Sequence, residues 1–442
     1  MEMSKQDYRV LLICLLGIFF SLQGISQKIK VAKEIPVGMG WANNSINTVI
    51  FRKNSLCSFG DTQYISYYNN DGFIVLGKRK LIAGKWELKT TNLKGNVADA
   101  HNSISIMVDG DGYLHLAWSH HSNKLYYYKS IKPGSLEMTD ESPMTGSMEQ
   151  KVTYPEFHCF PNGNLLFLYR DGQSGQGNLV INRYNTKEKK WTQLHTNLID
   201  GKKKRNAYWQ ACIDAKGIIH ISWVWRESSD VASNHDMCYA RSTDGGLTWE
   251  NSNGEKYQVP INATTAEYVC RIPQKSELIN QTSMYADDDG NPIIASYWKE
   301  TGDTVPQYHI IYNVNGKWQV RNLGFRKTTF SLSGAGTKRI PISRPQVISW
   351  KEKSNKFIAV VFRDEERGNK ISVAVNSNVQ FNEWKISDLT SASVGSWEPT
   401  YDTELWKKKK QLNLFVQFTE QQDAEGKSNI PAQPIKVLVL KK

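Results

Sequence analysis

Seven short segments of the chain alternate apolar and polar residues in the manner of half-buried β-strands. In order they read TQYISYYN, YLHLAWSH, NLLFLYRD, IIHISWVW, PIIASYWK, KFIAVVFR and LNLFVQFT, at intervals of roughly 45 to 75 residues. Turns rich in Asp, Asn and Gly precede most of them, such as DGDG at 109–112 and DDDG at 287–290. Alternation with a period of two, interrupted by such turns, predicts antiparallel β-hairpins.

A tryptophan follows most of these segments, in a further stretch that we interpret as the outer strand of the same unit: Trp86, Trp191, Trp249, Trp318 and Trp384. Four antiparallel strands repeated seven times predict an all-β fold, a seven-bladed β-propeller with four-stranded blades. A β-helix would need a much shorter repeat, and a sandwich would not need seven units. Closing the ring requires a shared blade, so we expect KIKVAKEI at 28–35 or IKVLVL at 435–440 to complete a blade begun at the other end.

Residues 1–26 have the order of a secretory signal peptide. Lys5 and Arg9 precede the 11-residue apolar run VLLICLLGIFF, and the polar SLQGISQ follows it. The run is too short to span a bilayer, so we expect cleavage and secretion, either extracellular or periplasmic. A lipid anchor on Cys14 is less favoured because the preceding Ile13 is not small. Residues 27–442 then form one propeller domain.

The net charge narrows the choice of partner. The chain carries +12 at pH 7, and loss of the signal segment leaves this unchanged because its two basic and two acidic side chains cancel. A basic secreted protein favours an anionic polymer, and we expect an acidic polysaccharide. We interpret KKKK at 407–410 as a solvated turn, and we expect no nucleic acid, no membrane contact after signal cleavage, and a monomer.

The cysteines do not indicate a disulfide framework. Five remain after signal removal, an odd number without CxxC spacing: Cys57, Cys159, Cys212, Cys238 and Cys270. Such residues are more often small buried hydrophobes than partners in bridges.

In a propeller the innermost strands run along the axis, so their ends at one face surround a common mouth. At that position the chain offers polar and ionisable side chains: Asn43, Asn44, His101, Asn102, Tyr154, Glu156, Arg205, Asn206, Asn280, Gln281, Arg344, Glu398 and Tyr401. Convergence of such groups is typical of a ligand site. We assign substrate binding to Asn102, Arg170, Asn206, Tyr208, Arg226, Gln281 and Arg344.

The stretch HNSISIMVDGDGYLHLAWSHH at 101–121 begins and ends on histidine. A hairpin returns close to its start, so we expect His101 and His121 to meet, whereas mid-strand His115 and His220 are structural. Histidine exchanges protons near neutral pH, tyrosine donates or accepts them, and arginine binds a carboxylate through two hydrogen bonds. This set suits β-elimination from a uronic acid: arginine neutralises the carboxylate, a base removes the C5 proton, and an acid protonates the departing glycosidic oxygen.

Four stretches resemble the BNR-repeat family that includes the propeller-fold ulvan lyases. They are DAHNSISIMVDGDGYLHLAWSHHSNKLYYYKS, FLYRDGQSGQGNLVINRYN, KRNAYWQACIDAKGIIHISWVWRE and SNHDMCYARSTDGGLTW. The resemblance implies a secreted polysaccharide lyase acting on ulvan, a polymer of sulfated rhamnose and uronic acid. It places the catalytic histidine pair on His101 and His121 and the neutralising arginine on Arg205. It places the catalytic tyrosine on Tyr184, with Tyr169 as second choice.

The resemblance also bears on metals. Some relatives hold a structural metal, zinc or calcium, through His and Cys near the third stretch. Here only Cys212 and His220 match, and Gln210 stands where another ligand is expected. We therefore expect that no cofactor is required, with a structural zinc or calcium on Cys212 and His220 as the alternative.

Two other functions remain open. A sialidase-like glycoside hydrolase is also a propeller with Asp boxes, but STDGGLTW at 242–249 is a single clear box and RIP occurs late, at 271–273 and 339–341. A non-catalytic sugar-binding propeller would explain the polar mouth and the charge without needing the histidine pair. Elimination alone creates an unsaturated uronyl product that absorbs ultraviolet light.

Overall fold

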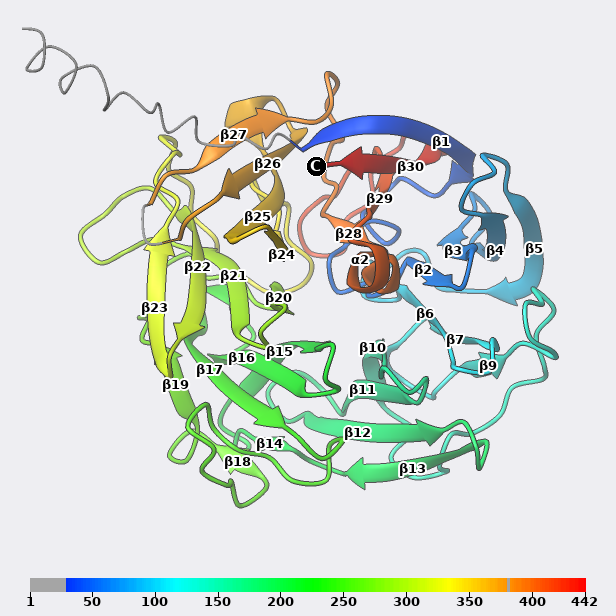
Figure 1. Ribbon diagram of the computed structural model, residues 1–442, viewed down its shortest axis with the longest axis horizontal. Coiled ribbons are helices and arrows are strands. Elements are labelled where there is room, and N and C mark those ends of the chain that lie inside the picture. The colour runs from blue at the N-terminus through cyan, green and yellow to red at the C-terminus, as the bar shows by residue number, and fades with distance from the viewer. Residues whose placement is uncertain (1–28, 380–381) are drawn as a thin grey trace, which may run out of the picture.

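The computed structural model describes residues 29–379 and 382–442, and the predicted signal peptide lies outside this range. Seven antiparallel sheets surround a central axis as the blades of a propeller (Figure 1). The predicted fold class is confirmed. The first blade consists of β2 (Leu56–Phe59), β3 (Thr62–Tyr68), β4 (Phe73–Lys80) and β5 (Glu87–Lys94), and the second of β6 (Ile104–Val108), β7 (Leu114–Trp118) and β9 (Tyr127–Lys129). The third consists of β10 (Val152–Cys159), β11 (Leu165–Asp171), β12 (Asn178–Asn185) and β13 (Lys190–His195), and the short strand β8 (His121–Asn123) pairs with β10 at its inner edge.

The next three blades are four-stranded. They comprise β15 (Asn206–Ile213), β16 (Ile219–Arg226), β17 (Asn234–Ser242) and β19 (Glu267–Cys270); β20 (Ser283–Ala286), β21 (Pro292–Trp298), β22 (Gln307–Val314) and β23 (Lys317–Asn322); and β24 (Gln346–Glu352), β25 (Asn355–Asp364), β26 (Lys370–Asn376) and β27 (Lys385–Asp388). A short parallel pair, β14 (Ile199–Asp200) and β18 (Ile261–Asn262), lies outside the blades. The outer edge of the second blade is reduced to a bridge between Ser130 and Met138.

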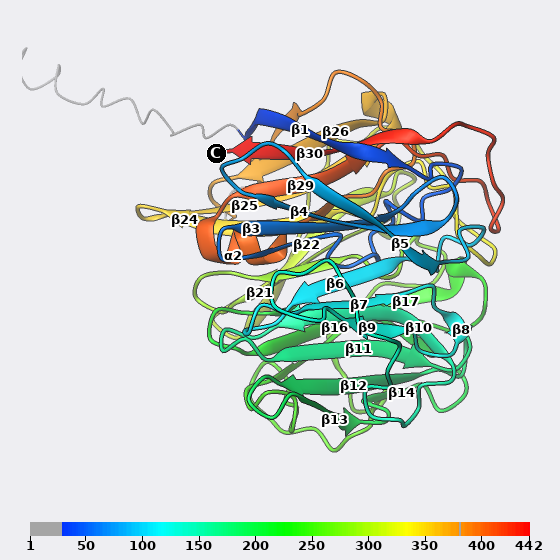
Figure 2. The ribbon, with the colours of Figure 1, turned by 90° about the vertical axis from the view of Figure 1, so that its right-hand side faces the viewer.

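The seventh blade closes the ring with both ends of the described chain. Strand β1 (Lys30–Gly40) pairs along its length with β30 (Gln433–Lys441), which continues through β29 (Leu412–Gln417) to β28 (Thr400–Tyr401). Figure 2 shows β1 and β30 running side by side. Both terminal segments named from the sequence take part, because each supplies one strand to the same sheet.

The sequence reading is wrong at two places near the axis. Residues 407–410 are not a solvated turn: helix α2 (Thr403–Lys409) begins after Asp402, whose carboxylate accepts from the N–H of Leu405, and it lies beside the axis in Figure 1. The first blade's inner strand starts at Leu56, because 43–54 forms turns in place of the expected strand.

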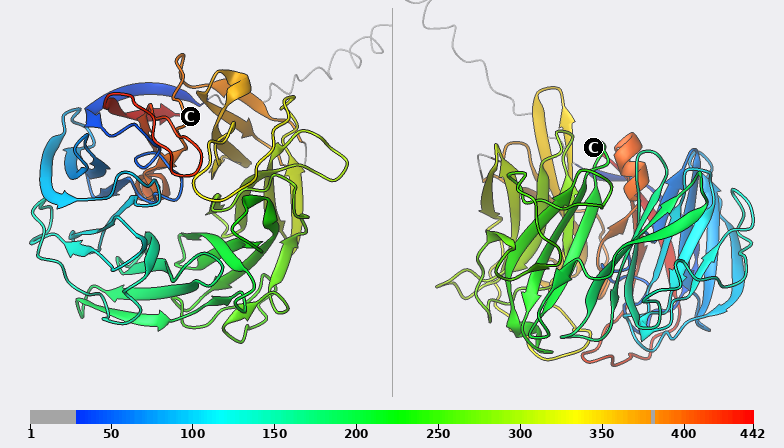
Figure 3. Two further views of the ribbon diagram at one scale, coloured as in Figure 1. Left: turned by 180° about the vertical axis from the view of Figure 1, so that it is seen from behind. Right: turned by 90° about the horizontal axis from the view of Figure 1, so that it is seen from below.

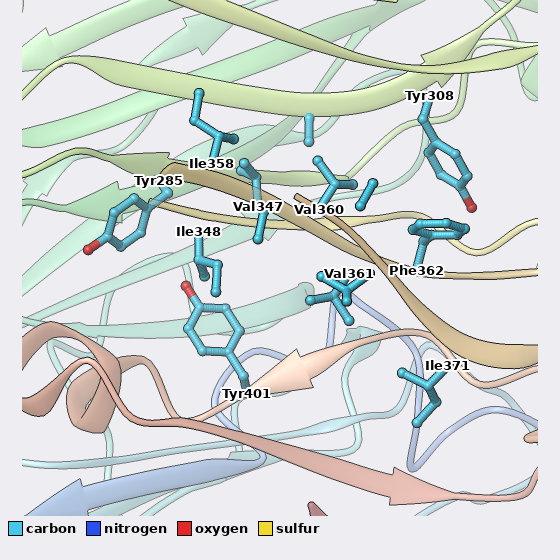
Figure 4. Packing of buried hydrophobic residues seen from close by; sticks show 14 of the residues in the cluster. Tyr285, Tyr308, Val347, Ile348, Ile358, Val360, Val361, Phe362, Ile371 and Tyr401 are labelled. Carbon is cyan, nitrogen blue, oxygen red and sulfur yellow. The ribbon is translucent and has the colours of Figure 1, made fainter. Parts of the chain in front are cut away.

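Apolar side chains fill the spaces between blades. On β24 and β25, alternate residues face opposite neighbours, so one sheet contributes to the packing on both sides (Figure 4). The Asp-box turn at 242–249 is structural: Asp244 accepts from the N–H groups of Leu247 and Thr248, and Trp249 is fully buried. No helix in the described residues is long and apolar enough to cross a bilayer.

Candidate active site

Strand register defines which end of the propeller carries the site. His121 on β8 lies opposite Thr153 on β10, and Thr153 lies opposite Arg170 on β11. In the next blade Asn206 pairs with Arg226 at the equivalent end. Seen from this side, the loops after β23 and β29 lie over the centre of the ring (Figure 3, left). The DGDG turn is at the other end, as the hairpin predicts.

The structure brings His101 and His121 together. Their rings stack with centroids 4.1 Å apart and planes inclined by 18°. Asp99 bridges them: Oδ1 lies 2.8 Å from Nδ1 of His101, and Oδ2 lies 2.5 Å from Nδ1 of His121. A second carboxylate, Glu425 from the loop between β29 and β30, places Oε1 3.2 Å from the same His101 nitrogen.

Two carboxylates on one imidazole decide its charge. Burial favours the neutral ring, but hydrogen bonds and charge from Asp99 and Glu425 outweigh it and raise the pKa of His101 to about 9. The same contacts overcome the effect of burial on Asp99 and hold the pKa of its carboxyl well below the usual range. His101 is therefore an imidazolium at neutral pH.

His121 is arranged differently. About a third of its side chain, 37%, is exposed, against 12% for His101. Because Nδ1 donates to the Asp99 carboxylate, the neutral ring carries its lone pair on Nε2. This orientation suits a general base whose other nitrogen is fixed by a carboxylate.

Tyr154 enters the mouth because β10 is irregular at that point. The pairing of β10 with β11 shifts between Thr153 and Glu156, and Tyr154 has a left-handed φ of 58° immediately before Pro155. A bulge of this kind redirects a side chain out of the regular alternation. The Tyr154 ring lies 5.8 Å from that of His101 and 6.2 Å from that of Tyr208, and burial raises its pKa, so the phenol stays protonated.

Two arginines flank these tyrosines. The Arg170 guanidinium lies 5.0 Å from the Tyr154 ring centroid, and that of Arg226 lies 5.3 Å from the Tyr208 centroid. Burial opposes ionisation of Tyr208, but the charges of Arg170 and Arg226 outweigh it and lower its pKa to about 8. Nε and Nη1 of Arg170 are buried without a hydrogen-bond partner in the described chain. These unpaired donors make Arg170 a candidate partner for a ligand anion.

The glycine-rich loop 171–177 makes room for Arg170. A Cβ on Gly177 would collide with Cγ and Cδ of the arginine. The glycine therefore allows the arginine to lie flat beside the loop, and the loop acts on the site through that side chain.

The floor of the mouth is a buried ion pair. Arg344 donates to both carboxylate oxygens of Glu398, from Nε at 2.8 Å and from Nη2 at 2.5 Å. Its guanidinium also lies 5.2 Å from the ring of Phe51, which stacks on His101. Arg344, predicted to bind substrate, is thus already paired. The hollow above it has a volume of ≈ 50 Å³.

The two tyrosines chosen for catalysis lie away from the histidine pair. Tyr184 pairs with Leu165 at the opposite end of its blade, five residues along β12 from the level of Arg170, or about 17 Å. Its ring packs against His115 and Trp191. Tyr169 is fully buried and, by strand alternation, faces the opposite side from Arg170. The geometry therefore moves the candidate tyrosine to Tyr154.

Arg205 lies at the same end of the propeller, but its side chain is paired with Glu227 and not with a group of the mouth. Its Nε is 2.7 Å from Oε1 of Glu227, which also contacts Nε2 of His235 at 2.7 Å. Of the arginines that the sequence offered, Arg170 and Arg226 are the ones beside the tyrosines.

Three further predicted binding residues have mainly local partners. Asn102 donates to the carbonyl of Asn96, and Asn206 accepts from the N–H of Gly177. Gln281 lines the mouth with a left-handed φ of 55°. Asn206 retains an unpartnered buried Nδ2 in the described chain, so it keeps a donor that no described group uses.

The two candidate metal ligands from the sequence, Cys212 and His220, lie in the fourth blade. Cys212 and His220 are cross-strand partners, but Nδ1 of His220 lies 2.7 Å from the Tyr239 hydroxyl and Nε2 lies 3.5 Å from Asp214. In the part of the chain that the structure describes, one group brings three side chains of metal-binding type together, Asp99, His101 and His121, within 4.8 Å. Asp99 is hydrogen-bonded to both histidines, whose rings stack on each other. His115, as predicted, is structural, bonded to Asp109 and Tyr127.

Three groups of the site were missed as functional from the sequence. Asp99 stands two residues before His101, and DAH is a local signal that could have been used. Tyr154 was recognised as part of the mouth but not as a catalytic candidate; TYP, a tyrosine before proline at the start of a strand, was its signal. Glu425 has no local signal, because it comes from the other end of the chain.

A first prediction concerns the charge of His101. Replacing Glu425 with glutamine removes one of the two carboxylates that favour the imidazolium, so the pKa of His101, followed by NMR titration, should fall by about 1 unit or more. Thr337→Val is the control, because the Thr337 hydroxyl, 3.4 Å from His101 Nδ1, carries no charge. An unchanged pKa in Glu425→Gln would contradict the assignment.

The raised pKa of His101 also determines how the stability of the folded protein changes with pH. Since the folded value, about 9, exceeds the ordinary 6.5, His101 binds its proton more tightly in the folded protein. Its contribution to the free energy of unfolding is therefore complete below pH 6.5 and is lost as pH rises to about 9. Chemical denaturation at a series of pH values should show a smaller loss in Glu425→Gln.

The fold and site together define a propeller with an acid–base and arginine-rich mouth, and comparisons with known proteins give the family. Residues 62–326 match the model of the BNR repeat-containing family. This is more than half of the chain, which therefore belongs to that family.

Two curated relatives are ulvan lyases. The short isoform from Alteromonas sp. (strain LOR) is 30% identical over 137 residues, 27% of this chain and 25% of that protein. The long isoform from Alteromonas sp. is 23% identical over 310 residues, 55% of this chain and 31% of that protein. The chain thus spans less than a third of the length of each.

Solved structures share the whole fold. The polysaccharide lyase Uly1 superposes with a TM-score of 0.66 at 16% identity, covering 93% of this chain and 99% of that one. A PL25 ulvan lyase bound to -[GlcA(1-4)Rha3S]- gives 0.65 at 12% identity, covering 91% and 96%. At such identities the likeness establishes the propeller.

Proposed function

We propose that this protein is a secreted polysaccharide lyase that cleaves a uronic-acid-containing, sulfated polysaccharide of the ulvan type by β-elimination. The observation that carries the proposal is the stacked His101–His121 pair, joined by Asp99 and lying beside Tyr154. The family relationship and the ulvan lyases among its relatives support the substrate class. The signal-like order of residues 1–26 supports secretion.

Each group has a distinct task in the proposed reaction. Arg170, helped by Arg226, binds the uronate carboxylate and stabilises the negative charge that develops when C5 loses its proton. His121 accepts that proton on Nε2. Electrons of the C5–H bond form the C4–C5 double bond as the bond from C4 to the glycosidic oxygen breaks. Tyr154 donates its proton to that oxygen, and solvent returns the enzyme to its starting protonation.

The charges of the mouth fit this division of work. His101 remains cationic, which adds positive potential where the carboxylate binds without consuming the base. Tyr154 is protonated and can act as an acid, whereas Tyr208, with a pKa near 8, is the alternative proton acceptor on the same side. When the pKa values of two neighbouring titratable groups are far apart, the group with the higher pKa can serve as the acid and the other as the base.

A glycoside hydrolase that works through paired carboxylates is less consistent with the site. Hydrolysis by paired carboxylates requires two acidic groups on either side of the glycosidic bond. Asp99 and Glu425 instead share one histidine nitrogen, and Glu398 is engaged by Arg344.

The test is a reaction with ulvan, with a uronate polymer lacking sulfate, and with a neutral polysaccharide. Elimination predicts rising ultraviolet absorbance from the unsaturated uronyl product with ulvan and none with the neutral polymer. New reducing ends without absorbance would identify a hydrolase. Binding without either signal would identify a non-catalytic lectin-like propeller, and either result would overturn the proposal.

A further inference from the structure

A row of charged side chains crosses the outer part of the fourth blade at the same end as the mouth. We call Arg205, Glu227, His235, Asp236 and Arg271 the rim cluster. The strand register orders them: Arg226 on β16 pairs with Asn234 on β17, and Met237 on β17 pairs with Cys270 on β19. With strands about 4.8 Å apart, the row extends about 15 Å outward from β15.

The members of the rim cluster are connected by short contacts. Glu227 joins Arg205 to Nε2 of His235, and Nδ1 of His235 lies 3.1 Å from Oδ2 of Asp236. The same Asp236 oxygen lies 3.1 Å from Nη1 of Arg271. With His235 protonated, three cations face two carboxylates, so the row is net positive.

The outer end of the row is preformed. Asp236 has a left-handed φ of 55°, accepts from the N–H of Ile272 through Oδ1, and donates its own N–H to the Ile272 carbonyl. These bonds hold the segment 271–274, which together with His235 and Asp236 lines an open hollow of ≈ 340 Å³.

Arg271 is the exposed cation of this hollow. Its side chain is 69% exposed, and its guanidinium stacks 3.4 Å from the centroid of the Tyr268 ring. Stacking fixes the plane of the guanidinium and turns its remaining N–H groups toward solvent. A planar, pre-oriented guanidinium beside an open hollow suits a carboxylate or sulfate ester.

We propose that the rim cluster is a distal subsite that binds an anionic unit, a uronate or a sulfated sugar, of the polymer that occupies the mouth, with Arg271 as its principal contact. This inference rests on the proposed lyase function and deepens it. A chain leaving the mouth past Arg226 reaches Arg271 after crossing three adjacent strands. Arg205 then serves as an inner member of this subsite, not as the neutralising arginine of the reaction.

The test compares a long ulvan polymer with an ulvan tetrasaccharide. In Arg271→Ala the ratio of KM for the polymer to KM for the tetrasaccharide should rise about fivefold or more, since one charge-assisted contact is lost, and Arg271→Lys should restore part of it. Added salt should reduce the difference because the contact is exposed. The matched control is Arg241→Ala, an arginine paired with Glu250 toward the opposite end of the same blade, which should leave the ratio unchanged.

A binding measurement keeps this inference separate from the proposed function. In a His121→Ala background, calorimetry with the polymer should show weaker binding when Arg271→Ala is added. If the wild type shows no elimination with any uronate polymer, the proposed function fails. If elimination occurs but Arg271→Ala changes neither the KM ratio nor polymer binding, the distal subsite is wrong.

Discussion

Replacing His121 with alanine is expected to lower kcat for polymer cleavage by about 10²- to 10⁴-fold, the range that a positioned general base contributes. The fold should survive, because 37% of the side chain is exposed and its bonded nitrogen contacts only the shared carboxylate among the described groups. Initial rates of ultraviolet absorbance, together with a thermal unfolding curve, measure both effects. His101→Ala should also be inactive, through loss of a cation beside the substrate carboxylate.

The control for this experiment is His158→Ala. His158 is also a histidine bonded to a carboxylate, 2.9 Å from Glu156, but it lines the cavity at the opposite end of the channel. It should retain activity. A His121 variant that keeps more than half of the wild-type rate, or a His158 variant that loses as much, would contradict the site assignment.

Replacing Arg170 with alanine is expected to reduce kcat/KM by about 10²- to 10³-fold, as for the loss of a group that stabilises developing negative charge. Nε and Nη1 of Arg170 have no hydrogen-bond partner in the described chain, so truncation leaves few protein groups unpaired. The side chain is nevertheless buried, so its loss opens a cavity, and a thermal unfolding curve must accompany the rates. Arg205→Ala should have a much smaller effect on kcat, expressed mainly in KM for the polymer.

A chemical variant of the substrate tests the reason for that loss. Methyl esterification removes the charge of the uronate carboxylate, so wild type and Arg170→Ala should become similar on the esterified polymer. If Arg205→Ala instead proves as inactive as Arg170→Ala does on the acid form, the neutralising role belongs to Arg205, as the resemblance to ulvan lyases first suggested.

The sequence predicted most reliably those features of the fold that follow from the pattern of neighbouring residues. Alternation in segments such as IIHISWVW, with a turn before most of them, was enough to predict seven blades. A hairpin bounded by His101 and His121 was enough to predict that the two histidines meet. Both inferences depend on strand periodicity, which is a property of neighbouring residues. Helix α2 was missed because its few residues follow directly after a strand, and its capping residue Asp402 was not recognised as a signal.

The candidate tyrosine of the site, Tyr154, could not be predicted in the same way. Strand alternation places Tyr169 and Arg170 on opposite faces, so choosing a strand does not choose a side chain. Tyr154 reaches the mouth only through a bulge, and periodicity gives no warning of an irregularity. Glu425 reaches His101 from the last blade, and a contact between residues so far apart follows from ring closure and not from any motif.

Ring closure also makes the active site depend on synthesis of the whole domain. Strand β30, which pairs with β1, follows the loop that carries Glu425 to His101. A nascent chain, or one clipped before Gln433, therefore has an unpaired β1 edge and lacks the support for that loop at the same time. Exposed strand edges promote aggregation, so the intermediate is vulnerable as well as inactive. If the proposed function holds, elimination activity reports that β1 and β30 have paired.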